Sequence, residues 1–165
     1  MRLGSRKIGP NSPCFVIAEA GVNHNGDRRI AARLIDIAAD AGADAVKFQT
    51  FCAASVVSPD APKAAYQKRL TDPGQSQLDM IRGLELNEAD FRAISDHCRW
   101  RKITFLSTPF DAPSVDLLMR LEVPGFKIAS GDVTNLPLLR KIAATGLPAI
   151  LSTGMSDLDE VAAAV

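Results

Sequence analysis

Short apolar stretches alternate along the chain with longer stretches in which apolar residues recur at helical spacing. The short stretches predict β-strands at residues 14–18, 45–50, 103–107, 126–132 and 149–152. A helical stretch follows each of them, which is typical of a parallel α/β sheet covered on both faces. The pattern therefore predicts five strand–helix units in order along the chain.

The predicted helices have recognisable ends. Asp27 is a suitable N-cap for the first helix, and Gly42 lies where a C-terminal cap belongs. The apolar positions of this helix are Ile30, Leu34, Ile37, Ala38 and Ala41. Asn87, with Asp90 three residues later, predicts a capping box for the second helix. Helices are predicted at residues 27–41, 87–101, 112–121 and 135–145, and from Ser156 onward.

Two stretches depart from this repeat. Residues 1–13 hold two glycine-containing turns around a short polar piece, which predicts a small hairpin ahead of the main domain, residues 14–165. Residues 51–83 contain several helix-breaking prolines, with helical pieces predicted near residues 64–70 and 75–82. A long insertion between a strand and a helix is typical of a loop that covers or binds something.

Composition narrows the class of protein. Nineteen basic and nineteen acidic residues cancel, so nothing in the charge favours nucleic acid or an anionic membrane as a partner. No apolar run approaches the roughly 20 residues that span a bilayer, and the first residues lack a signal-peptide apolar region. Three widely spaced cysteines fit reduced thiols, so a cytoplasmic location is expected.

Two architectures fit the alternation: an open doubly wound sheet and a (β/α)₈ barrel of the TIM type. A doubly wound nucleotide-binding fold should show a glycine-rich phosphate loop after an early strand, and residues 21–26 do not match one. The barrel is favoured because its strands carry inward polar residues. A complete barrel takes roughly 250 residues. The chain is therefore expected to be the first part of a barrel, with about five of the eight units.

Polar side chains lie at or near the predicted strand ends, where barrel enzymes build their active sites. They are Glu19, Lys47, Gln49, Thr108, Lys127, Ser130, Asp132 and Ser152. A lysine inside a buried strand is costly without an anionic partner, and two lysines with three hydroxyls suit a phosphate. Two carboxylates can move protons or orient a polar substrate. The residues thus predict an enzyme acting on a small phosphorylated or carboxylated molecule, and leave the reaction open.

Five motifs make the chain resemble the N-acetylneuraminate (sialic acid) synthase family. They are IAEAGVNHNG at 17–26, ADAVKFQT at 43–50, LSTPFD at 106–111, KIASGD at 127–132 with TNLP at 134–137, and LSTGM at 151–155. The resemblance covers nearly the whole chain in the right order. The tripeptide Ser130-Gly131-Asp132 favours a resemblance to the neuraminate and legionaminate synthases over the pseudaminate synthases.

The resemblance implies a reaction in which phosphoenolpyruvate condenses with the open-chain aldehyde of an N-acetylated hexosamine, usually N-acetylmannosamine. The C3 carbon of phosphoenolpyruvate attacks the aldehyde, water attacks C2, and the bond to phosphate breaks. The products are a nine-carbon 2-keto acid and phosphate. A divalent metal, Mn²⁺ or Mg²⁺, is expected to polarise the aldehyde.

The motifs also imply roles for individual residues. The groups that resemble phosphoenolpyruvate ligands are Lys47, Thr108, Lys127, Ser130 and Ser152. Gln49 resembles a sugar contact, whereas Glu19 and Asp132 resemble the carboxylates beside the reacting carbons. Structural roles stay open for both carboxylates, with loop capping as the alternative for Asp132. Polar candidates for sugar binding in the insertion are Tyr66, Gln67, Gln75 and Ser76.

One departure from the family bears on activity. The family's two metal-binding histidines lie on later strands, beyond Val165, as does the C-terminal domain that completes the partner's site in the family's dimer. This chain has His24, for which loop packing is the main alternative, and His97, expected to be structural. The chain alone is expected to be inactive and to form a homo-oligomer. The open alternatives are a truncated, non-catalytic fragment and a related phosphoenolpyruvate-condensing synthase of 3-deoxy sugar acids.

Overall fold

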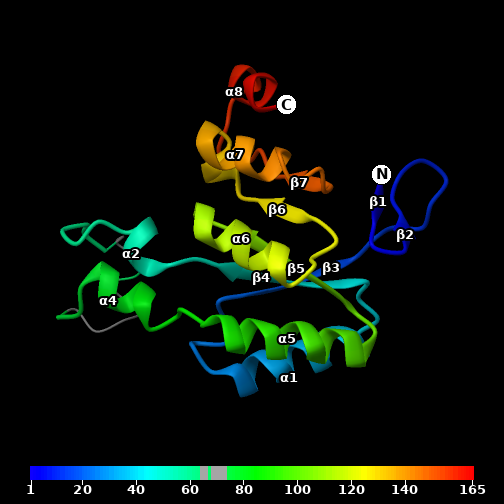
Figure 1. Cartoon of the computed structure of the whole chain (residues 1–165), viewed down its shortest axis with the longest axis horizontal. Helices are drawn as coiled ribbons and strands as arrows, with labels where there is room; N and C mark the ends of the chain where they lie inside the picture. Colours follow the sequence, from blue (N-terminus) through cyan, green and yellow to red (C-terminus); the bar gives the residue numbers. More distant parts are fainter. Residues whose placement is uncertain (64–66, 68–73) are drawn as a thin grey trace.

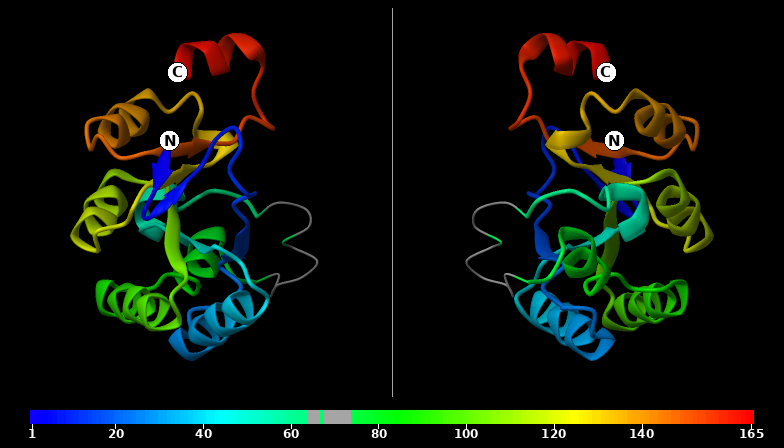
Figure 2. Two further views of the ribbon diagram at one scale, coloured as in Figure 1. Left: turned by 90° about the vertical axis from the view of Figure 1, so that its right-hand side faces the viewer. Right: turned by 90° about the vertical axis from the view of Figure 1, so that its left-hand side faces the viewer.

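The computed structural model describes residues 1–63, residue 67 and residues 74–165. Within these residues, strands and helices alternate along the chain as predicted. Helices α1, α5, α6 and α7 follow one another around the outside of the strands, in an arc rather than a closed ring (Figure 1 and Figure 2). Because the strands are parallel, their carboxyl ends lie together at one end of this partial barrel.

The strands follow the chain order. β3 (Ile17–Gly21) pairs in parallel with β4 (Ala45–Thr50), and β4 pairs in parallel with β5 (Thr104–Pro109). β6 (Phe126–Ile128) pairs in parallel with β7 (Ala149–Leu151), and β6 lies beside β5 (Figure 2). In the described part of the chain the order does not reverse, whereas a doubly wound sheet reverses at its switch point. The predicted fold is confirmed: this is an incomplete (β/α) barrel of the TIM type.

The helices have the bounds that the sequence predicts to within a few residues. They are α1 (Arg28–Asp40), α5 (Glu88–Arg101), α6 (Ala112–Arg120), α7 (Leu136–Ala143) and α8 (Leu158–Ala164). The side chain of Asp27 caps α1, and Asn87 and Asp90 form the predicted capping box on α5. The last helix begins later than predicted, because Asp157 rather than Ser156 caps it and forms a capping box with Glu160.

The two irregular stretches contain short elements. The first is an antiparallel hairpin of β1 (Arg2–Leu3) and β2 (Arg6–Lys7), as predicted. The insertion after β4 contains α2 (Ala53–Val56), which the sequence did not predict, and α4 (Gln77–Arg82), which it did. The piece predicted near residues 64–70 and the candidate Tyr66 fall outside the described residues, apart from position 67.

The first barrel strand starts later than predicted. It spans Ile17–Gly21 rather than residues 14–18, and Val16 is still exposed. The Val16 N–H donates to the Asp44 carboxylate (2.8 Å), and the Val16 carbonyl accepts from the Asp44 N–H (2.9 Å). This exchange joins residues 28 apart and engages the backbone of Val16 before the ladder to β4 begins. The strand then runs from Ile17 through Glu19 to Gly21.

The buried face of α1 differs in part from the prediction: Ala38 is buried and Leu34 packs against the core as predicted, but the two isoleucines do not. Ile30 and Ile37 are 41% and 57% exposed, whereas Ala31, Ile35 and Ala38 face the sheet and are buried. The apolar stripe of this helix is broad, so its pattern is compatible with more than one orientation. Small residues at the contact allow the helix axis to approach the sheet closely.

Two apolar clusters fill the structure. The larger one lies between the helices and the outer face of the strands and includes Phe48, Phe91 and Phe126. The smaller one lies inside the strands, where Leu3 of the hairpin packs with Ala45 and Leu106. Leu3 is fully buried, so the hairpin closes the amino end of the barrel interior. The carboxyl end is consequently left for polar side chains. No described helix is long and apolar enough to cross a bilayer.

Candidate active site

The parallel register brings four predicted site residues together on three adjacent strands. Glu19 of β3 lies opposite Lys47 of β4, and Gln49 of β4 lies opposite Thr108 of β5. Lys47 and Gln49 alternate with Val46 and Phe48, whose side chains belong to the outer core, so the polar pair points to the barrel interior. Thr108 is 2% exposed. The strand alternation thus produces a polar group at the carboxyl end of the barrel.

An ion pair joins two of these residues. The Lys47 ammonium contacts the Glu19 carboxylate, and their side chains are 11% and 54% exposed. The lysine is therefore held in the barrel interior, while the carboxylate reaches water. This arrangement provides the anionic partner that a strand lysine requires. It also leaves Glu19 accessible to a substrate.

Gly21 leaves space for these side chains. Its φ of +56° lies in the left-handed region, which favours glycine. A Cβ at this position would lie 3.2 Å from Glu19 Oε1 and 3.8 Å from Gln49 Nε2. Glu19 and Gln49 therefore both lie next to the backbone where β3 ends.

Lys127 reaches the same group from β6. Its Nζ donates to the Ile128 carbonyl (2.6 Å) and forms no ion pair with another described residue. Burial lowers the pKa of Lys127, the positive charge of Lys47 lowers it further, and the Glu19 carboxylate opposes the shift. Two lysines near one carboxylate leave an excess of positive charge. An anion is the ligand that such a cluster favours.

The other predicted hydroxyls lie at the ends of β6 and β7. Ser130 begins the short 3₁₀ helix η1 (Ser130–Asp132), and its carbonyl accepts from the Ser156 hydroxyl (3.3 Å). The Ser152 N–H donates to the Ile128 carbonyl (3.1 Å), which continues the pairing of the two strands. Both serines thus lie near the end of the strand that carries Lys127.

Asp132 has a different environment from Glu19. Its carboxylate accepts from the Asn135 side chain (3.2 Å), and its carbonyl accepts from the Asn135 N–H (3.0 Å). Asn135 in turn caps α7. Among the described residues, no contact joins Asp132 to Glu19 or Lys47. This geometry is that of a loop-capping carboxylate, the alternative considered for Asp132 from the sequence.

The two histidines lie outside this group. His24 is 1% exposed, packs against Phe48 of the outer core, and accepts from the Gly26 N–H through Nδ1 (3.1 Å). His97 is paired with Asp36 (2.9 Å), which joins α5 to α1. No group of three or more metal-ligating side chains occurs in the described residues. The side chains that the structure describes therefore do not form the divalent metal site implied by the sequence resemblance.

Asp111 is a buried carboxylate of this region that was not predicted to be a site residue. Asp111 caps α6 through the Ser114 N–H (2.7 Å) and also accepts from the Cys52 N–H (2.6 Å) after β4. The sequence contains a signal for the cap, an aspartate before an apolar helical stretch. The contact to Cys52 spans 59 residues, so no local pattern predicts it.

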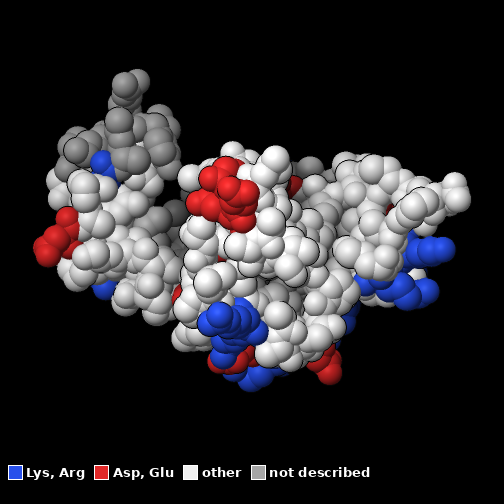
Figure 3. Space-filling view, turned by 90° about the horizontal axis from the view of Figure 1, so that it is seen from above, with Lys and Arg blue, Asp and Glu red and all other residues white. Residues whose placement is uncertain are grey.

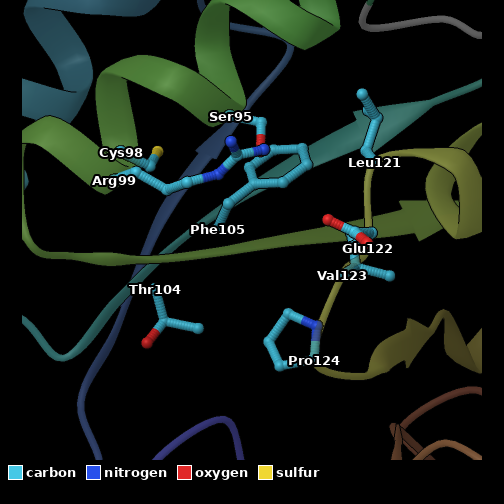
Figure 4. Close-up of a pocket in the computed structure, with 9 residues that line it drawn as sticks. All are labelled: Ser95, Cys98, Arg99, Thr104, Phe105, Leu121, Glu122, Val123 and Pro124. Atoms are coloured by element: carbon cyan, nitrogen blue, oxygen red, sulfur yellow. The ribbon is translucent and has the colours of Figure 1, made fainter.

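A cavity of about 210 Å³ lies at the opposite end of the strands, between α5 and the segment before β6 (Figure 4). It is lined by Thr104, the first residue of β5, together with Cys98, Arg99 and Glu122. Burial raises the pKa of Cys98 to about 12, so the thiol stays protonated. On the face of the molecule that carries α8, charged residues lie in separate small groups (Figure 3). Neither the cavity nor this face gathers charged groups as the carboxyl ends of the strands do.

Comparisons with known proteins show what the chain is similar to. A model of the NeuB family matches residues 34–165. The chain is 52% identical over 147 residues to the N,N'-diacetyllegionaminic acid synthase of Campylobacter jejuni, covering 89% of this chain and 44% of that protein. It is 35% identical to the N-acetylneuraminate-9-phosphate synthase of Homo sapiens, covering 93% of this chain and 43% of that protein.

The fold is similar to a solved structure of the same kind. The crystal structure of the N-acetylneuraminic acid synthetase of Leptospira borgpetersenii, in complex with citrate, superposes with a TM-score of 0.82 at 36% identity. The match covers 99% of this chain and 53% of that chain. The chain thus spans about half the length, or less, of the relatives described here.

Proposed function

Because the chain belongs to the NeuB family, we propose that it contributes the phosphoenolpyruvate-binding half of a sialic-acid-type synthase. Relatives of this family include synthases of legionaminic and neuraminic acids. The family predicted from five sequence motifs is therefore confirmed. The observation that supports the proposed reaction is the group of Lys47, Lys127 and Glu19 at the strand ends.

The charges of this group suit phosphoenolpyruvate. The substrate carries a carboxylate and a phosphate, and two ammonium groups lie where it would bind. Thr108, Ser130 and Ser152 supply hydroxyls at the ends of β5, β6 and β7. Glu19 is the carboxylate proposed to lie beside the reacting carbons, where it would hold or move a proton as water adds to C2. Gln49 is the proposed sugar contact.

The similarity to a legionaminic acid synthase narrows the choice of acceptor sugar. Phosphoenolpyruvate contains no nitrogen, so a product with two N-acetyl groups requires an acceptor that already carries both. The identity to the Campylobacter jejuni N,N'-diacetyllegionaminic acid synthase supports such a doubly N-acetylated hexose as the acceptor. N-acetylmannosamine is the alternative, supported by the likeness to the neuraminate synthases.

The experiment is phosphate release from phosphoenolpyruvate with Mn²⁺ and each sugar in turn. It compares the 165-residue chain with the protein as its natural reading frame encodes it (the natural-length protein). We expect release from the natural-length protein and none from the 165-residue chain, because the described residues lack a metal site. The sugar with the higher kcat/KM identifies the acceptor. Release from neither protein with either sugar would refute the proposed function.

A further inference from the structure

Asp111 is a buried carboxylate that joins two segments beside the site. It is 8% exposed, follows β5, and its two oxygens accept from the backbone of different segments. Oδ1 accepts from the Ser114 N–H in the first turn of α6, and Oδ2 accepts from the Cys52 N–H at the start of the insertion after β4. A helix cap needs one oxygen only. The second oxygen therefore provides a connection beyond capping.

Three further contacts strengthen this connection. The Phe110 N–H donates to the Thr50 carbonyl (3.1 Å), and the Phe51 and Phe110 rings pack edge to face at 6.5 Å. Within the strands, the Thr50 and Ser107 hydroxyls share a buried hydrogen bond of 2.7 Å. We call this set, centred on Asp111 and Cys52, the strand-end clasp.

Glu85 holds the same segment from the other end of the insertion. Its carboxylate accepts from the Ala53 N–H (2.9 Å), directly after Cys52. Two carboxylates thus bind two successive backbone N–H groups. The start of the insertion is consequently fixed both to the end of β5 and to the segment that precedes α5.

The clasp lies directly after two proposed substrate contacts. Gln49 and Thr108 are register partners, and the next residue on each strand, Thr50 and Pro109, is again a register pair. The clasp begins there, so it determines the separation and orientation of the two strand ends. A shift in a strand end moves its last side chain with it, and small displacements at an active site are costly.

We propose that Asp111 is a positioning residue for the acceptor sugar, acting through the strand-end clasp on Gln49. This inference rests on the proposed function. The two substrates depend on the clasp unequally. Phosphoenolpyruvate is held by groups on β4, β5, β6 and β7, of which the clasp adjoins one, Thr108. The sugar contact proposed on the strands is Gln49, which the clasp adjoins directly.

The test uses Asp111→Asn in the natural-length protein. The amide retains one oxygen for the Ser114 N–H but presents an N–H₂ donor to the Cys52 N–H, so the cap remains and the clasp is lost. Asp157→Asn is the matched control, because Asp157 is an N-cap that bonds within its own helix, α8. Asp111→Ser is a second variant that retains a capping oxygen but is too short to reach both N–H groups.

Both variants at Asp111 are expected to raise the KM for the sugar about tenfold, with the KM for phosphoenolpyruvate changed less than about twofold. Hydrogen exchange at the Cys52 amide should become faster in both variants. Asp157→Asn should change neither the KM for the sugar nor this exchange rate. Unchanged sugar KM despite faster exchange would refute the positioning role. Equal rises in both KM values with a lowered Tm would show a purely structural role and refute it as well.

The failure of the proposed function gives a distinct result. If the wild-type natural-length protein turns over neither sugar, the proposed function fails and the positioning role fails with it. Exchange at the Cys52 amide would then still report whether the clasp exists. A wild-type protein that is active, with an Asp111→Asn variant indistinguishable from it, would refute the inference alone.

Discussion

Lys47 of β4 lies opposite Glu19 of β3 in the parallel register, and the two side chains form an ion pair in which the lysine is mostly buried and the carboxylate mostly exposed. Under the proposed function, the pair supplies one group for binding and one for proton transfer on neighbouring strands. Lys47 is fixed by the interior of the barrel, so its charge stays in place when a substrate arrives. Glu19 is the more accessible partner and the better candidate for direct chemistry.

Glu19→Gln is therefore expected to lower kcat of the natural-length protein by about 100-fold. Folding stability should change only modestly, because the glutamine amide oxygen can still accept from the mostly buried Lys47 ammonium and position 19 is more than half exposed. The measurements are phosphate release and thermal unfolding. Asp40→Asn is the matched control, since it removes an exposed carboxylate that pairs with Arg101 where α1 and α5 end, at the opposite end of the strands. An activity of Glu19→Gln within about threefold of wild type would contradict a catalytic role.

The lysine cluster predicts how phosphoenolpyruvate binding depends on pH. The pKa of Lys127 lies below its usual 10.5 because of burial and the nearby Lys47. The anion binds the protonated form, so affinity should fall as pH rises through this lowered pKa. Calorimetric titration of the natural-length protein between pH 7 and 10 measures the effect.

Two variants at Lys127 separate its charge from other groups. Lys127→Arg keeps a positive charge throughout this range, so its affinity should lose the alkaline decline. Lys127→Met should bind weakly at every pH. If Lys127→Arg shows the same decline as wild type, a group other than Lys127 is responsible.

The order of elements was predictable because each unit carries its own signal. Alternation of apolar and polar residues identified the strand 45–50 and placed Lys47 and Gln49 on its inner face, which fixed the side on which the site forms. Caps such as Asn87 with Asp90 identified helix starts, since the capping box depends on residues three apart. Such local rules need no knowledge of the tertiary structure.

The predictions failed where contacts between distant residues determine the structure. The start of β3 depends on the exchange between Val16 and Asp44, 28 residues apart. The clasp from Asp111 to Cys52 spans a longer distance still. The sequence left the role of His24 open, and its burial in the loop after β3 depends on packing against Phe48 of β4. Sequence spacing alone contains none of these three-dimensional neighbours.

His24 predicts a loss of stability at mildly acidic pH. Burial lowers its pKa below 6.5, so the unfolded chain binds a proton more readily than the folded one. Its contribution is fully present above pH 6.5 and decreases as pH falls toward the lowered pKa. His24→Gln stays neutral and should lose less stability than wild type between pH 7.5 and pH 5.

Urea unfolding of the wild-type and His24→Gln natural-length proteins at several pH values measures this difference. His97 is present in both proteins, so its own titration cancels in the comparison. Parallel pH profiles of the two proteins would show that His24 does not titrate differently in the folded and unfolded states.

The open edges of the barrel predict self-association of the 165-residue chain when it is expressed by itself. Among the described residues, β3 pairs with β4 alone and β7 pairs with β6 alone, so each carries one unpaired edge. A cavity of about 620 Å³ between these edges and the hairpin is lined by apolar residues, including Phe15, Ile17 and Ile150. Exposed edges and apolar surface favour pairing with a second copy.

Light scattering during size-exclusion chromatography, over a range of loading concentrations, tests this prediction. Ala149→Lys places a charge at the exposed start of β7 and should shift the chain toward monomer, since edge lysines oppose strand pairing. Ile37→Lys is the matched control, because Ile37 is exposed on α1 rather than on a strand edge, and it should leave the distribution unchanged. A cooperatively melting monomer at every concentration would contradict the prediction. Equal effects of the two lysines would assign the association to general apolar exposure rather than to the strand edges.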